Sequence, residues 1–155
     1  SFVLVGGGKE KQNLLAQARE MCLPNVRFLP PQPKSRMPEI LAAADAGLAI
    51  LKNIPMFNTT YPNKVFDYMA AGRPTVLAIG GVIREVVESA KGGVFVPPGD
   101  PEALATAVQT LADDPERCVE MGSAARSYVE AHFDRRLQAQ KLEATLEVVY
   151  QGSDR

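Results

Sequence analysis

Residues 63–78 read NKVFDYMAAGRPTVLA, a run in which a helical pattern is followed directly by an apolar strand pattern. Apolar side chains recur at helical spacing up to Ala71. Gly72 and Pro74 then end the helix, because glycine favours the C-terminal cap and proline cannot continue the helical hydrogen bonding. The stretch therefore predicts a helix from about Asn63 to Ala71 and a buried strand over Thr75–Ala78.

The same alternation of strand and helix patterns continues on both sides of this stretch. We predict further strands over 2–5, 26–29, 46–51 and 93–96, and helices over 14–22, 40–44 and 84–90, after Asp100, after Asp114 and after Asp134. Lys52–Pro62 has no periodicity and is predicted as a loop. Buried strands that alternate with helices form a parallel sheet covered on both faces. The prediction is an α/β fold with a doubly wound, Rossmann-like parallel sheet, in one domain over residues 1–155.

Composition excludes several classes of function. The chain has 155 residues, 46% of them apolar, and a formal net charge of −1 with no basic stripe, so we expect no nucleic-acid partner. No apolar run approaches the roughly 20 residues that span a bilayer. We expect Cys22 and Cys118, both within predicted helices, to be buried reduced thiols. With His132 as the one histidine, expected at a helix end or on the surface, a metal site lacks ligands.

Three glycine- or proline-rich segments follow predicted strands, where doubly wound folds bind ligands. Gly6-Gly7-Gly8 could bring backbone amides close to a phosphate, although the dinucleotide fingerprint fails because Lys11 stands where its third glycine belongs. Gly80-Gly81 has the same two interpretations, close approach to a ligand or a tight turn. Pro31-Gln32-Pro33-Lys34 could form a wall for a flat base or simply a stiff loop.

Polar side chains gather at the start of the predicted helix at Asn63. Asn63, Lys64 and Asp67 lie about one turn apart, where free backbone amides and the lysine charge favour a diphosphate. Asp67 could accept hydrogen bonds from a ribose diol. The alternative is an ordinary N-terminal cap, a surface lysine and an acidic first turn.

Together these segments resemble the C-terminal domain of the group 1 retaining glycosyltransferases, enzymes of the two-lobed GT-B architecture. The matching landmarks, in the family's order, are Leu4–Gly8, Asn25–Leu29, Ile40–Asp45, Asn63–Pro74, Gly80-Gly81 with Glu85, and Val96–Leu104. The resemblance covers nearly the whole chain, and the Asn63–Pro74 and Val96–Leu104 segments are its most specific parts.

The resemblance implies a role for each matching residue. The two glutamates of the family motif fall on Thr59, near the donor sugar, and on Asp67, at the donor ribose; Thr59 is a departure from the family. The residues expected at the donor diphosphate are Gly6, Gly7, Thr60, Asn63 and Lys64. The base is expected against Pro31, Gln32, Pro33 and Lys34. No metal or other cofactor is expected.

The implied function is binding of a nucleoside-diphosphate sugar by an enzyme that transfers a hexosyl or N-acetylhexosaminyl group in bacterial polysaccharide or lipopolysaccharide synthesis. In the family, a strand–helix unit and an acceptor-binding N-terminal lobe precede these landmarks, and the last helix crosses onto that lobe. We expect this chain alone to be inactive, and the full-length enzyme to be cytoplasmic, with peripheral association at the inner face of the membrane. A nucleotide-sugar 2-epimerase and a non-catalytic nucleotide-binding module remain as alternatives.

Overall fold

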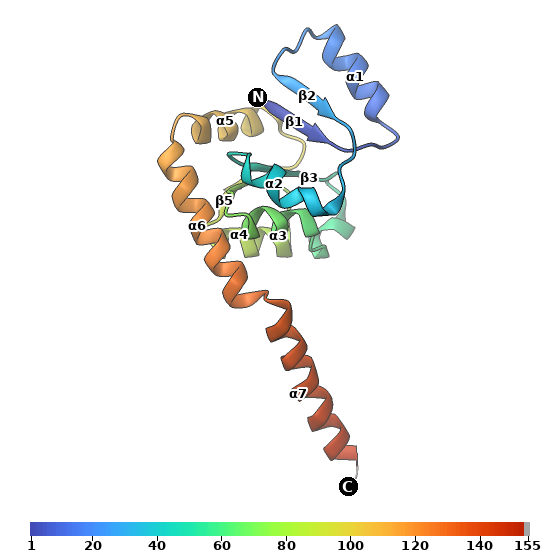
Figure 1. The fold of residues 1–155 in the computed structure, drawn as a ribbon, viewed down its shortest axis with the longest axis vertical. Coiled ribbons are helices and arrows are strands. Elements are labelled where there is room, and N and C mark those ends of the chain that lie inside the picture. Colours follow the sequence, from blue (N-terminus) through green and yellow to red (C-terminus); the bar gives the residue numbers. More distant parts are fainter. Residues whose placement is uncertain (154–155) are drawn as a thin grey trace. The chain divides into compact units, whose positions relative to one another are not determined.

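The computed structural model describes residues 1–153, which divide into two compact units (Figure 1). The first unit comprises residues 1–40 and the second begins at Leu41. Helix α2 (Met37–Ala42) spans the boundary between them. Each unit has its own sheet, so each is described separately.

The first unit is a strand–helix–strand arrangement. β1 (Phe2–Val5), α1 (Lys11–Glu20) and β2 (Val26–Leu29) follow one another, and the two strands pair in parallel from Phe2 with Val26 to Val5 with Leu29. A short 3₁₀ helix, η1 (Lys34–Arg36), leads to α2. The strands lie where the sequence predicts them, but the prediction that Phe2–Val5 is buried was wrong. Val3 and Leu4 point to opposite faces and are 52% and 40% exposed, because one helix cannot cover both faces of a two-stranded sheet.

The predicted burial of the two cysteines was also wrong. α1 ends at Glu20, and Cys22 follows it in the left-handed conformation with φ of +50°, while the amide of Leu23 donates to the carbonyl of Ala18. This hydrogen bond closes the helix in the manner of a Schellman cap and directs Cys22 outward, so it is exposed. Cys118 is half-buried, and its thiol donates to the carbonyl of Leu111 at 3.2 Å.

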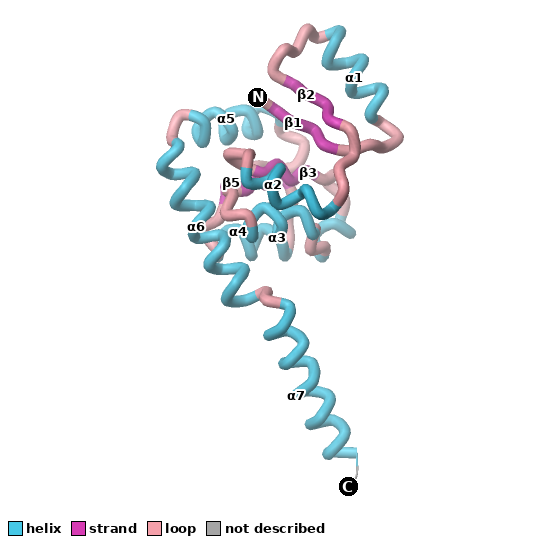
Figure 2. Tube along the Cα trace, in the orientation of Figure 1, coloured by secondary structure: helices cyan, strands magenta, loops and turns pink. Residues whose placement is uncertain are grey.

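The second unit contains a three-stranded parallel sheet with strand order β3–β4–β5. Its elements are β3 (Gly47–Ile50), the 3₁₀ helix η2 (Pro55–Thr59), α3 (Asn63–Ala70), β4 (Thr75–Ala78), α4 (Val82–Ser89), β5 (Gly93–Phe95), α5 (Pro101–Ala112), α6 (Pro115–His132) and α7 (Arg135–Ser153). Figure 2 distinguishes these helices and strands from the connecting loops. All four residues of β4 are buried, as a central strand requires.

Helices cover both faces of this sheet, and each face has its own core cluster. On one face Leu77 and Ile79 pack with residues of α3, α4 and α6, among them Met69, Ile83 and Ala125. On the other face Val76 and Ala78 pack with Ala107 and Leu111 of α5. The predicted α/β fold with parallel strands and covered faces is therefore confirmed. The five strands form two sheets, since β2 pairs with β1 alone and β3 with β4 alone; that residues 1–155 form one domain stays a prediction.

Aspartates begin the three C-terminal helices, as the sequence indicates. Asp100 accepts a hydrogen bond from the amide of Ala103 at 2.9 Å, Asp114 from that of Arg117 at 3.0 Å, and Asp134 from that of Arg136 at 2.7 Å. The predicted last helix is present as α7, and its apolar residues Leu142, Leu146 and Tyr150 are exposed. None of the helices in the described part of the chain is both long and apolar enough to cross a membrane.

Candidate functional site

The carboxyl edge of the three-stranded sheet brings together two of the predicted segments. β3 and β4 are parallel neighbours, so the segment from Leu51 to Pro62 and the turn Ile79–Gly81 leave the sheet at the same edge. α3 and α4 begin there, and both contribute to the same core cluster. The elements that carry Thr59, Thr60, Asn63, Lys64 and Asp67 are therefore anchored on one side of one sheet.

Three side chains fix α3 on the sheet. Val65 and Met69 are completely buried. The hydroxyl of Tyr68 donates to the carbonyl of Leu48 at 3.2 Å, and the Tyr68 ring lies so close to Gly47 that a Cβ atom there would be 2.6 Å from Cε2. Because these contacts hold the inner side of α3, the polar residues on its other side keep a fixed position.

The N-terminus of α3 is left open by the protein. Pro62 occupies the cap position and no side chain accepts a hydrogen bond from the first turn of the helix in the described residues. α5 and α6 differ, because Asp100 and Asp114 cap them. Asn63 is exposed at the first helical position. Its amide and the next are directed at whatever occupies this end, where the helix dipole favours an anion.

Lys64 adds a full positive charge to this open helix end. Burial lowers the pKa of the Lys64 ammonium from its ordinary value, because desolvation disfavours the charged form. Among residues 1–153, no carboxylate lies within ion-pair distance of Lys64, and its ammonium donates no hydrogen bond to another group. A half-buried ammonium without an anionic partner can form an ion pair with a phosphate. Asp67, one turn further on, is exposed.

The segment before α3 is more ordered than the sequence indicates. Residues 55–59 form η2, which the prediction of an irregular loop missed. Pro55 at the first position was its local signal, since proline is favoured at the start of a helix. The hydroxyls of Thr59 and Thr60 both donate to the carbonyl of Met56, at 3.2 and 3.1 Å.

The remaining predicted residues lie in the first unit. Gly7 approaches Pro31 so closely that a Cβ atom on the glycine would lie 3.2 Å from Cγ of the proline. Lys11, which the sequence analysis did not select, donates from its ammonium to the carbonyls of Gly6 at 2.7 Å and Leu29 at 3.0 Å. Its signal was its place three residues after the glycine loop. This lysine ties the ends of the two strands together.

The proline-rich loop is stiff and polar. The side-chain amide of Gln32 donates to the carbonyl of Pro30 at 3.3 Å, while Pro33 and Lys34 are exposed at the start of η1. These contacts agree with a rigid loop, and a role in holding a base stays a prediction.

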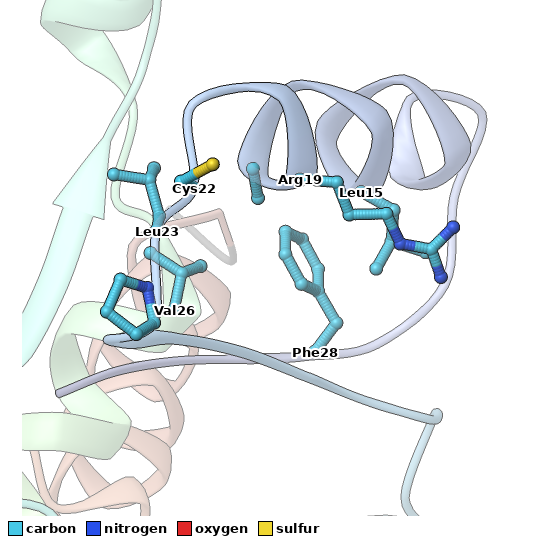
Figure 3. Close-up of a pocket in the computed structure, with 8 residues that line it drawn as sticks. Leu15, Arg19, Cys22, Leu23, Val26 and Phe28 are labelled. Atoms are coloured by element: carbon cyan, nitrogen blue, oxygen red, sulfur yellow. The ribbon is translucent and has the colours of Figure 1, made fainter.

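Two hollows lie in the first unit. The larger, of about 410 Å³, is apolar and contains none of the predicted site residues (Figure 3); Leu15, Ala18, Arg19, Cys22, Leu23, Pro24, Val26 and Phe28 line it. The smaller, of about 220 Å³, is lined by Gly6, Gly7, Gly8 and Lys11 among others. In the described residues, no group of three or more His, Cys, Asp or Glu side chains is arranged to hold a metal ion.

Comparison with protein families gives a match over most of the chain. Residues 1–114 match the model of the family described as Glycosyl transferases group 1. The chain belongs to this family. The glycosyltransferase domain is 32% identical over 105 residues to D-inositol 3-phosphate glycosyltransferase of Corynebacterium kroppenstedtii, a match that covers 68% of this chain and 22% of the relative. It is 28% identical over 135 residues to glycogen synthase of Mycobacterium tuberculosis, covering 86% of this chain and 31% of that enzyme.

A solved structure with a bound nucleotide sugar has a similar fold. Alr3699/HepE from Anabaena, crystallised with UDP-glucose, superposes with a TM-score of 0.79 at 26% identity, covering 94% of this chain and 40% of that one. The predictions of a glycosyltransferase family and of the C-terminal GT-B type of fold are confirmed. The family and the relatives favour a transferase over the 2-epimerase alternative. This glycosyltransferase domain spans less than a third of each of the two curated relatives.

Proposed function

We propose that the second unit of this glycosyltransferase domain binds the diphosphate and ribose of a UDP-sugar donor at the N-terminus of α3. The observation that carries the proposal is Lys64, a half-buried ammonium without an anionic partner beside uncapped helix amides. UDP is the nucleotide chosen because the Anabaena relative was crystallised with UDP-glucose. The match to a glycosyltransferase family supports a nucleotide-sugar donor as the anion that binds here.

Each residue at this helix end has a separate task in the proposed mechanism. The diphosphate gains negative charge as the bond to the sugar loosens, and the Lys64 ammonium with the amides of Asn63 and Lys64 stabilises that charge. Asp67 accepts hydrogen bonds from the ribose hydroxyls. Thr59 and Thr60, on the segment before the helix, lie toward the sugar. Because Thr59 is a hydroxyl where the family has a carboxylate, its contact with the sugar is a neutral hydrogen bond.

For the full-length protein, the proposed activity is that of a transferase. The enzyme transfers a hexosyl or N-acetylhexosaminyl group with retention of configuration, without a metal, in the synthesis of a bacterial polysaccharide. An N-terminal lobe binds the acceptor, and the enzyme works in the cytoplasm at the inner face of the membrane.

The test is a calorimetric titration of the 155-residue chain with UDP and UDP-glucose, repeated on two variants. Lys64→Met removes the charge but keeps the apolar stem, so it should weaken UDP binding by about 10- to 100-fold, the range expected when a hydrogen bond to a charged group is lost. Asp67→Ala should weaken it about 10-fold through the ribose. Lys141→Met, which changes an exposed lysine of α7, is the matched control and should bind as the wild type does.

Two results would contradict the proposal. Equal UDP affinity in wild type and Lys64→Met would remove Lys64 from the site. Binding of an unrelated diphosphate such as inorganic pyrophosphate as tightly as UDP, with no effect of Asp67→Ala, would reduce the site to a general anion site.

A further inference from the structure

The turn between β4 and α4 is in close contact with the segment that precedes α3. A Cβ atom on Gly81 would lie 2.5 Å from both the Cα and the carbonyl carbon of Asn58, and closer still to the Asn58 carbonyl oxygen. A Cβ atom on Gly80 would lie 3.2 Å from Oδ1 of Asn58. The space beside Gly81 is therefore filled by the backbone of Asn58, and the space beside Gly80 by the Asn58 side chain. Both earlier interpretations, ligand approach and a tight turn, omit this contact.

We propose that Gly81 is a positioning residue, which holds Thr59 and Thr60 at the donor sugar by seating the backbone of Asn58. This inference rests on the proposed function, since it assumes that Thr59 and Thr60 lie at the sugar. Asn58 is the fourth residue of the five-residue η2, and the two threonines follow it directly. Because peptide planes are rigid, a shift of the Asn58 backbone reaches Thr59 directly, and the hydrogen bonds within η2 limit how far φ and ψ can absorb it.

The hydrogen bonds inside η2 make this segment move as one piece. The amide of Phe57 donates to the carbonyl of Ile54 at 3.0 Å, and that of Thr60 donates to the carbonyl of Phe57 at 3.2 Å. Both threonine hydroxyls return to Met56. A side chain at position 81 would have to push backbone, which cannot rotate away as a flexible side chain can. The whole of η2 would shift.

α3 would remain in place while η2 shifts. Its contacts with the sheet come from Val65, Tyr68 and Met69, whereas the three atoms nearest to a Cβ on Gly81 all belong to Asn58. Lys64 and Asp67 belong to α3 and would therefore keep their positions. Gly81→Ala should therefore separate the two parts of donor recognition, leaving the diphosphate and ribose contacts and displacing the sugar contacts.

The test compares the affinity for UDP-glucose with that for UDP in the wild-type chain and two variants. Gly81→Ala should weaken UDP-glucose binding by about tenfold and UDP binding by less than about threefold. Gly99→Ala is the matched control, because Gly99 also has positive φ, +88° against +71° for Gly81, but a Cβ atom there meets nothing within 4 Å. Alanine there also meets a positive φ but lacks the contact, and its two affinities should fall by the same factor, if at all.

Hydrogen exchange provides a readout that does not depend on any ligand. The amides of Phe57 and Thr60 should lose protection in Gly81→Ala and keep it in Gly99→Ala. If Gly81→Ala does not fold, Gly80→Ala takes its place, since the 3.2 Å contact requires only a small movement of the Asn58 side chain. Gly80→Ala should then give a weaker loss of the same kind, about twofold to threefold for UDP-glucose.

The outcomes separate this inference from the proposed function. Equal loss of UDP and UDP-glucose affinity in Gly81→Ala, or unchanged exchange at Phe57 and Thr60, would overturn the positioning role. If the wild-type chain binds neither ligand, the proposed function fails and the assignment to the sugar falls with it. Exchange in the variants then still decides whether Gly81 holds η2.

Discussion

At the scale of the residue, the environment of Lys64 differs from that of an ordinary surface lysine. The residue is half-buried, its ammonium is partly desolvated, and no carboxylate in the described residues forms an ion pair with it. In the free protein, desolvation makes the charged form of Lys64 less favourable. An anion that binds beside the ammonium favours the charged form again, so binding depends on pH.

The pH dependence has a definite direction. The pKa of Lys64 in the folded chain lies below its value in the unfolded chain, so the unfolded chain holds more protons between the two values and stability rises with pH there. Bound diphosphate favours the ammonium and raises its pKa again. UDP affinity should therefore fall as the pH rises through the lowered pKa of Lys64.

The measurement is a UDP titration at several pH values from 7 to about 10, near the ordinary pKa of lysine. Lys64→Met is the reference, because any titration of UDP itself affects both proteins alike. The ratio of the wild-type to the variant affinity should decline with rising pH. A ratio that stays constant over this range would show that the charge of Lys64 does not take part in binding.

The residues of the candidate site differ in how far sequence could predict them. Asn63, Lys64 and Asp67 could be selected from sequence, because one helix start places them by local spacing alone. The contact of Gly81 with Asn58 joins two segments over twenty residues apart, and its reason is a backbone approach that no local pattern encodes. Cys22 was misjudged for a related reason, since its exposure depends on how α1 ends.

At the scale of the element, α3 is held between the sheet and α6. A Cβ atom on Gly122 of α6 would lie 2.7 Å from the carbonyl carbon of Gly72 and nearer to its oxygen, so the two segments meet backbone to backbone. Gly72 ends the segment that carries the candidate site. Sequence predicted both helices from their periodicity, but the crossing point is set by a glycine in the middle of α6 that reads as a helix-weakening residue.

Gly122→Ala tests this crossing, because two effects of opposite sign compete. Helix propensity alone predicts that alanine stabilises α6 by about 1 kcal/mol. Overpacking against the backbone of Gly72 predicts a loss of about 1–3 kcal/mol, and we expect this loss to prevail because backbone cannot move aside. Urea denaturation measures the net change. Ser123→Ala, at the exposed neighbouring position, is the control and should be neutral or slightly stabilising; a stabilising Gly122→Ala would contradict the close crossing.

At the scale of the whole molecule, the two units differ in how much core they enclose. Every buried residue lies at or beyond Gly47, within the second unit, while none of residues 1–40 is buried. Sequence predicted equal burial for the strands of both units, since their apolar runs look alike. Pattern alone could not show this difference, because the number of elements available to cover a strand is a property of the assembled fold.

This difference predicts unequal local stability, since segments with little buried apolar surface open at lower free energy. The amides that pair β1 with β2 should exchange through openings at least about 2 kcal/mol less costly than those of β4. Leu77→Ala, a cavity in the buried cluster around β4, should lower protection of β3, β4 and β5 by about 2–5 kcal/mol. It should leave the protection of β1 and β2 unchanged, because they belong to the other unit.

Equal protection of β1 and β4 in the wild type, with a parallel loss in Leu77→Ala, would instead mean that residues 1–153 unfold as one cooperative domain. Native-state hydrogen exchange followed residue by residue by NMR distinguishes these two results in a single pair of samples.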